Sequence, residues 1–174
     1  TSAAKDEEYI LQKTPTGKKE YPMHKRSWTY NTDSMLTAYA NSLFTYDADY
    51  HCLLQIDTTL QNGVWTAKRT EYDAQGKVLY TKTQEKRAAI DEWITVSETT
   101  PSYQLTTTIQ WNANPINRTI VKKYNYGFYN QYQIRESWNA ELQKWITNNS
   151  NCRYVQVNLG ENGEPLNAID YDGL

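Results

Sequence analysis

The chain has 174 residues, the size of about one domain, and its 18 basic and 20 acidic residues give a formal net charge of −2. The charges are mixed along the chain and form no basic stripe, so no nucleic-acid partner is predicted, and no apolar run approaches the roughly 18 residues of a membrane span. Aromatic residues make up 13% of the chain. Amphipathic rings must therefore form much of a thin core.

The N-terminal segment, residues 1–17, is predicted to be partly flexible. Residues 5–13 are compatible with two short helical turns, and Thr14-Pro15-Thr16-Gly17 marks a break. Residues 18–174 are then expected to form a single domain. The chain begins without Met, as after removal of a signal peptide, although a trimmed recombinant chain would begin the same way. We expect a secreted, periplasmic or cell-surface protein.

A repeated unit follows this segment. Tyr46-Asp47-Ala48 and Tyr72-Asp73-Ala74 each open a stretch with Leu seven places after the Tyr. Between them, Asn62-Gly63 precedes Trp65 and is a strong hairpin signal, because both residues tolerate positive φ. The unit is interpreted as turn, Trp strand, Tyr-Asp turn and Leu strand. Fainter copies run from Trp28 through Tyr30-Asn31 to Leu36, from Ile116 through Tyr124-Asn125 to Ile134, and from Trp145 past Tyr154 to the turn at Asn162-Gly163.

Alternation predicts further strands between these copies. Apolar residues and Thr occupy every second position of residues 103–111, with Gln and Thr between them. Residues 84–92 hold helix-favouring residues in a row and are expected to form an enlarged loop. The sequence thus predicts an all-β fold: an antiparallel meander of tandem hairpins in a curved or two-layered sheet, with little helix.

One copy carries a family resemblance. The stretch from Tyr72-Asp73 through Gly76 to Leu79 resembles the core of the YD repeats of Rhs-type and teneurin-type exported proteins. Spaced Tyr-Asp turns with Trp strands are also similar to short secreted proteins of unknown function from the Bacteroidetes. The Tyr46 copy lacks the Gly, and Asn replaces the Asp at positions 31 and 125. The resemblance implies an antiparallel hairpin array and export, and no activity.

Candidate chemistry is sparse. His24 and His51 lie far apart, and no nucleophile elbow or phosphate-binding loop is present. Residues 47–52 include side chains that could bind a metal ion, but their spacing along a strand and turn would not bring them together around one ion. Glu71 and Asp73 form one candidate carboxylate pair, and Asp47 and Asp49 form another. The Asp of each Tyr-Asp pair is better explained as a turn former. We expect no catalytic residue, metal or cofactor.

The two cysteines leave two alternatives open. Cys52 and Cys152 are interpreted either as two separate buried thiols or as a disulfide that closes a long loop.

The aromatic residues are the one abundant feature suited to binding. The densest patch is predicted to be a ligand-binding surface for a glycan or an envelope protein, because both faces of a strand would carry rings. It comprises Tyr124, Tyr126, Phe128, Tyr129 and Tyr132. Turn and repeat roles are predicted for Tyr46, Asp47, Trp65, Tyr72, Asp73 and Gly76.

The leading functional hypothesis is therefore an exported, non-enzymatic binding module that uses an aromatic sheet face. The first alternative is a structural or self-assembly component of a surface complex, associating through edge strands. The second alternative is a glycan hydrolase that uses carboxylates such as Glu71 and Asp73.

Overall fold

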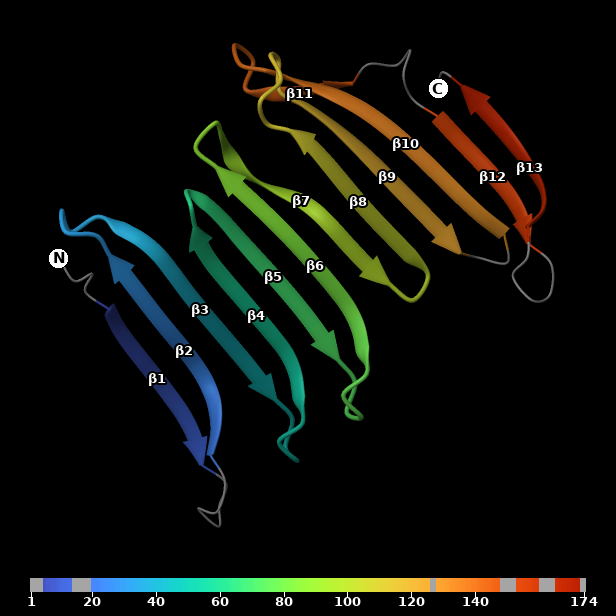
Figure 1. The fold of residues 1–174 in the computed structure, drawn as a ribbon. Coiled ribbons are helices and arrows are strands. Elements are labelled where there is room, and N and C mark those ends of the chain that lie inside the picture. The colour runs from blue at the N-terminus through green and yellow to red at the C-terminus, as the bar shows by residue number, and fades with distance from the viewer. Residues whose placement is uncertain (1–4, 14–19, 126–127, 148–152, 160–164, 173–174) are drawn as a thin grey trace. The chain divides into compact units, whose positions relative to one another are not determined.

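The computed structural model describes residues 5–13, 20–125, 128–147, 153–159 and 165–172 (Figure 1). These residues form strands and turns and contain no helix, and so none that could cross a membrane. The strands are β1 (Lys5–Lys13), β2 (Glu20–Tyr30), β3 (Leu36–Tyr46), β4 (Cys52–Gln61), β5 (Val64–Tyr72), β6 (Val78–Arg87), β7 (Ile90–Thr100), β8 (Tyr103–Gln110), β9 (Asn117–Asn125), β10 (Phe128–Asn139), β11 (Lys144–Thr147), β12 (Arg153–Leu159) and β13 (Pro165–Asp172). The predicted antiparallel all-β meander is confirmed.

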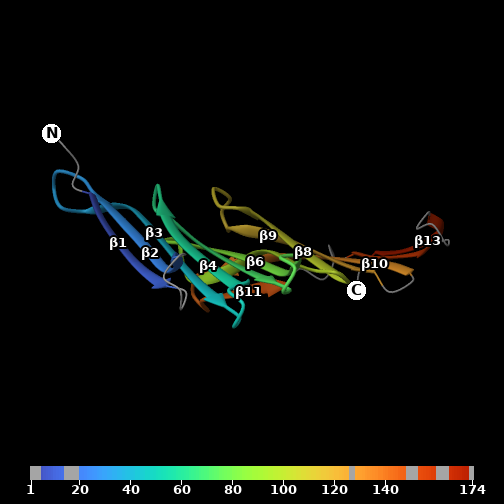
Figure 2. The same cartoon turned by 90° about the horizontal axis from the view of Figure 1, so that it is seen from below.

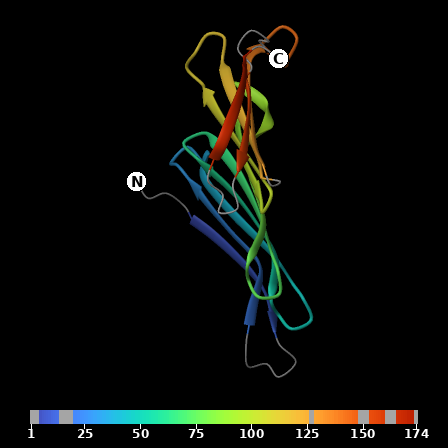
Figure 3. The ribbon, with the colours of Figure 1, turned by 90° about the vertical axis from the view of Figure 1, so that its right-hand side faces the viewer.

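The strands fall into two compact units, residues 1–95 and 96–174. In unit 1, β1 to β6 pair in sequence order and are followed by the start of β7. In unit 2, the end of β7 pairs with β8, β8 with β9, and β9 with β10. The other side of β10 pairs first with β12 and then with β11, and β13 pairs with β12. Within each unit the strands form one twisted layer (Figures 2 and 3).

A single layer leaves little room for a core. The buried apolar side chains of the described residues are Leu60, Ile90 and Ile94. Leu60 lies between Tyr39 and Trp65 in the cross-strand register, and the centroids of those two rings are only 5.6 Å apart. The rings therefore lean over Leu60 and provide the cover that a second layer would otherwise give. Trp65 takes part in this cover.

Three five-residue turns in unit 1 share one geometry, and we call them the Tyr-Asx turns: residues 31–35, 47–51 and 73–77. The preceding strand ends on Tyr in each, with a register irregularity just before that Tyr. The Asn or Asp at position one accepts the backbone N–H groups of positions three and five through its side-chain oxygen. At Asp73 these distances are 3.0 Å and 2.8 Å. The side chain thus replaces backbone partners that the turn cannot supply.

Position four of each Tyr-Asx turn has a positive φ. The angle is 59° at Ser34, 66° at Tyr50 and 80° at Gly76. Glycine adopts this region without steric cost, whereas other residues pay for it. The β4–β5 hairpin uses a different turn, in which Asn62 and Gly63 have φ of 49° and 75°, as a two-residue hairpin loop requires.

Two local predictions were wrong. Residues 5–13 form strand β1 and not helical turns, because they pair along their length with β2. Residues 84–92 are not a loop, since β6 continues to Arg87 and β7 begins at Ile90. By contrast, the alternation predicted for residues 103–110 is confirmed: Gln104, Thr106, Thr108 and Gln110 are exposed, and Thr107 is buried. The predicted break at residues 14–17 lies outside the described residues.

Candidate functional site

The predicted aromatic patch is only partly described. Tyr124 is half-buried on β9, and its ring centroid lies 5.1 Å from that of Tyr103, its cross-strand partner. Tyr126 lies outside the described residues. Phe128, Tyr129 and Tyr132 belong to β10, where Tyr132 is opposite Lys122 on β9, but their side chains are outside the described part of the structure.

A concavity forms instead at one end of unit 1, between two Tyr-Asx turns, and we call it the turn groove. The turns of residues 47–51 and 73–77 both lie at this end because one hairpin, β4–β5, separates them and returns the chain (Figure 1). The turn groove has a volume of about 700 Å³, within the range of about 300–1,000 Å³ usual for small-ligand sites. Its lining residues are Phe44, Tyr46, His51, Cys52, Gln55, Tyr72, Ala74, Gln75 and Gly76.

One wall of the turn groove is a packed ring cluster. The rings of Phe44 and Tyr46 are stacked with centroids 6.4 Å apart, and Tyr21 meets Tyr46 edge-on at 5.5 Å. Tyr21 also stacks on Tyr50 at 4.9 Å, which compensates for the positive φ of Tyr50. The Tyr46 hydroxyl donates to the Pro22 carbonyl at 2.8 Å. This wall is held from several sides and is therefore preorganised.

The Tyr46 phenol stays protonated in this wall. Burial raises its pKa above the ordinary value of 10.0, and the neighbouring Cys52 and Tyr21 add to the shift. The hydroxyl thus remains a hydrogen-bond donor to Pro22 at neutral pH.

Besides the tyrosine hydroxyls and the Cys52 thiol, the polar groups described in the lining of the turn groove are two neutral amides and one histidine. Gln55 is anchored by donating from Nε2 to Asp57 at 2.8 Å. His51 is exposed, and its Nδ1 lies 3.0 Å from a carboxylate oxygen of Asp47. This contact with Asp47 orients the imidazole ring. Gln75 is exposed on the opposite turn.

Asp47 is held as a carboxylate by its own turn. The backbone N–H of His51 is the main cause that lowers the Asp47 pKa below its ordinary value of 3.8, and the His51 ring and the Asp49 N–H act in the same direction. This carboxylate therefore serves the turn and the His51 orientation.

Cys52 lines the turn groove as a free, half-buried thiol. Burial raises its pKa above the ordinary value of 9.0, although a backbone hydrogen bond with Leu54 opposes the shift. The thiol is protonated at neutral pH and is a poor nucleophile. Cys152, its possible disulfide partner from the sequence, lies outside the described residues.

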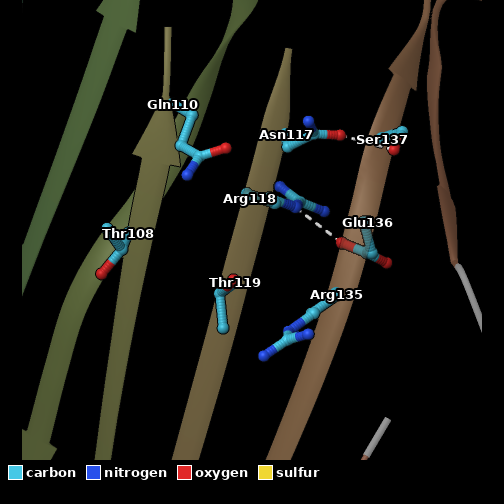
Figure 4. A pocket seen from close by; sticks show the side chains of 8 residues that line it. All are labelled: Thr108, Gln110, Asn117, Arg118, Thr119, Arg135, Glu136 and Ser137. Atoms are coloured by element: carbon cyan, nitrogen blue, oxygen red, sulfur yellow. Dashed lines mark hydrogen bonds and ion pairs between the residues drawn. The ribbon is translucent and has the colours of Figure 1, made fainter. Parts of the chain in front are cut away.

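A second concavity, the polar pocket, lies across β8, β9 and β10 in unit 2 and has a volume of about 420 Å³ (Figure 4). Figure 4 shows Arg118 and Glu136 reaching toward each other, and Nε of Arg118 donates to Glu136 at 2.6 Å. The two side chains are 17% and 14% exposed. The remaining lining residues are Thr108, Gln110, Asn117, Thr119, Arg135 and Ser137.

The polar pocket is organised mainly by contacts that join its strands. The Arg118 guanidinium lies 4.1 Å from the ring centroid of Trp145, which packs against Trp138 at 5.4 Å. Ser137 donates to Asn117 at 2.6 Å. The buried charges of Arg118 and Glu136 are thus paired with each other, so they are engaged within the polar pocket.

The remaining candidate groups are used locally. Glu71 accepts from Nε of Arg69 at 2.7 Å, and Asp73 accepts two backbone N–H groups. His24 bonds the side chain of Asn41 on the neighbouring strand. Within the described residues, no three His, Cys, Asp or Glu side chains are grouped closely enough to hold a metal ion.

No family model, curated protein or solved structure matches the chain. The site is therefore interpreted from its own residues.

The sequence assigned turn or repeat roles to these residues of the two copies but did not predict that the two turns meet. Tyr46, Asp47, Tyr72 and Asp73 were predicted as turn residues only, whereas the structure places both turns around one concavity. The available signal was the single hairpin between the two copies, which places both turns at the same end of the sheet. Phe44 and Gln55 were missed because nothing in the local sequence distinguishes their strand positions.

Proposed function

We propose that the chain is an exported, non-enzymatic binding module and that a neutral sugar unit of a glycan occupies the turn groove. Export is supported by the composition and by the resemblance to YD-repeat proteins. The glycan proposal is supported by the chemistry of the turn groove.

The observation that carries this proposal is the lining of the turn groove. Phe44, Tyr46 and Tyr72 provide rings, on which the flat C–H faces of a sugar stack, and Gln55, Gln75 and His51 provide hydrogen-bonding groups beside them. Among the residues that the structure describes, no Lys, Arg, Asp or Glu lines the groove. An uncharged, hydroxyl-rich ligand fits this combination better than an ionic one, which would enter without a counter-charge.

A hydrolytic function is disfavoured by how the carboxylates are engaged. A glycoside hydrolase needs two carboxyl groups free to act on either side of the bond. Glu71 is paired with Arg69, and the acceptor oxygen of Asp73 holds its turn. Both groups are therefore committed to local structure.

The test is a glycan array probed with the whole chain, followed by calorimetric titration of the best ligand class. Tyr72→Ala removes one ring of the turn groove and is expected to weaken binding about tenfold, or about 1.4 kcal/mol. Tyr30→Ala is the matched control, because Tyr30 holds the same place in the turn of residues 31–35 but does not line the groove. Equal losses in both variants, or no binding to any glycan class, would contradict the proposal.

A second set of variants separates the turn groove from the aromatic patch predicted by sequence. Replacing Tyr126, Tyr129 and Tyr132 together by Ser is expected to leave glycan affinity unchanged. A loss of binding in this triple variant with full binding in Tyr72→Ala would instead assign the ligand to the patch in unit 2.

A further inference from the structure

Strand β1 forms one end of the strand order and presents apolar side chains. In the part of the chain that the structure describes, it pairs with β2 and with no other strand. Tyr9, Ile10 and Leu11 are 57%, 48% and 45% exposed. An edge strand of this kind carries a row of unpaired backbone N–H and C=O groups on its outer side, which recruits a further strand.

The sequence of β1 is complementary to itself in one antiparallel register. In two antiparallel strands related by a two-fold axis, residues that face the same side of the sheet lie opposite one another. The axis therefore passes at a residue, and moving it by one residue changes each pairing partner by two. With Ile10 opposite its own copy, Tyr9 comes opposite Leu11 and Glu7 comes opposite Lys13. This register pairs apolar residues with apolar residues, and each of the two Glu-Lys pairs joins opposite charges.

Neighbouring registers lack this match. Moving the two-fold axis by one residue, to Tyr9, brings Lys5 opposite Lys13 and Glu7 opposite Leu11. Moving it to Leu11 brings Lys13 opposite Tyr9. Like charges face each other in the first alternative, and neither alternative forms a Glu-Lys pair.

We propose that β1 pairs antiparallel with β1 of a second copy of this chain, about a two-fold axis at Ile10. The pairing continues the layer of unit 1 into the second copy and covers the three exposed apolar side chains at the edge. The interface is isologous, because the same strand contributes both sides. It lies on β1 and is independent of the glycan proposal for the turn groove.

The experiment measures oligomeric state by sedimentation and light scattering over a wide concentration range, with charge-reversal variants of the whole chain. The unchanged chain is expected to form dimers. Glu7→Lys and Lys13→Glu each place like charges opposite one another twice per dimer, and each is expected to raise the dimer dissociation constant about tenfold or more.

An equimolar mixture of Glu7→Lys and Lys13→Glu restores both opposite-charge pairs in a heterodimer. The mixture is therefore expected to associate more strongly than either variant alone, which a general loss of folding would not produce. Lys77→Glu is the control, because it reverses an exposed charge in a turn of unit 1 and should leave dimerisation unchanged. A monomeric chain at all concentrations, a dimer insensitive to both reversals, or a mixture no stronger than its components would overturn the proposal.

Discussion

The two ends of unit 1 use the same turn with different results. At one end, the Tyr-Asx turn of residues 31–35 lies next to the tight Asn62-Gly63 turn. None of the described residues that line the turn groove lies at this end. At the other end, the turns of residues 47–51 and 73–77 are neighbours and enclose the turn groove. The hydrogen bonds within the three turns are nearly identical. The concavity therefore arises from the adjacency of two turns and not from the turn itself.

The three Tyr-Asx turns share some side chains and differ in others. Position one is Asn in one copy and Asp in two, and position four is Ser, Tyr or Gly. The side-chain oxygen at position one is common to all three. The copies thus keep the same backbone conformation but differ in side chains that affect the stability of the turn and the surface it presents.

The largest effect is expected from removing the acceptor at position one. Asp73→Ala leaves the N–H groups of Gln75 and Lys77 without their side-chain partner and should destabilise the chain by about 1–2 kcal/mol in urea unfolding. Asp73→Asn should be close to the unchanged chain, because Asn31 already makes the same bonds. Asp49→Ala is the control, since Asp49 contributes only its backbone N–H to its turn. Equal losses for Ala and Asn at position 73 would contradict this account.

A smaller effect is expected at position four, with opposite signs at the two ends. Gly76→Ala meets no neighbouring atom but must adopt a φ of 80°, so it should cost about 1 kcal/mol. Ser34→Gly relieves the same strain, offset in part by the chain entropy of glycine, and should stabilise the chain by up to about 1 kcal/mol. Thermal unfolding of both variants checks the signs, and a stabilising Gly76→Ala would refute the strain argument.

The smallest expected effect is a difference in the pH dependence of stability between Asp and Asn at position one of the turn. The Asp47 pKa is lower in the folded chain than its ordinary value of 3.8. The stability it contributes is therefore full above that value and is lost as pH falls through the lower folded pKa. Asp47→Asn should remove this part of the acid dependence, as judged by unfolding midpoints measured from neutral to strongly acidic pH. An unchanged acid slope would show that the carboxylate form is not required.

The sequence predicted those parts of the fold whose signals are local. Asn62-Gly63 and the Tyr-Asp pairs mark turns through their own backbone preferences, and the alternation of residues 103–110 follows from one face being covered. Residues 84–87 were missed because both faces of a single layer remain half-solvated, so long charged side chains fit in β6 and the alternation fades. Lys5–Lys13 was missed because pairing with β2 overrides its helix-favouring composition.

The candidate site was less predictable than the turns that form it. Tyr46 and Tyr72 are far apart in sequence, and their approach depends on the length and register of the β4–β5 hairpin between them. Gln55 enters the groove only because its strand position faces Phe44 across β3 and β4. Such cross-strand neighbours are fixed by register, which a single sequence specifies weakly.

The meander has a consequence for how unit 1 acquires its structure. Each of its first six strands pairs with the strand that precedes or follows it in the chain, so the loops closed during folding are short. A sheet with such low contact order folds faster than Greek-key sandwiches of similar size. We expect hairpins to add to a nucleus one after another, with the rings over Leu60 from β3 and β5 as the place where that nucleus forms.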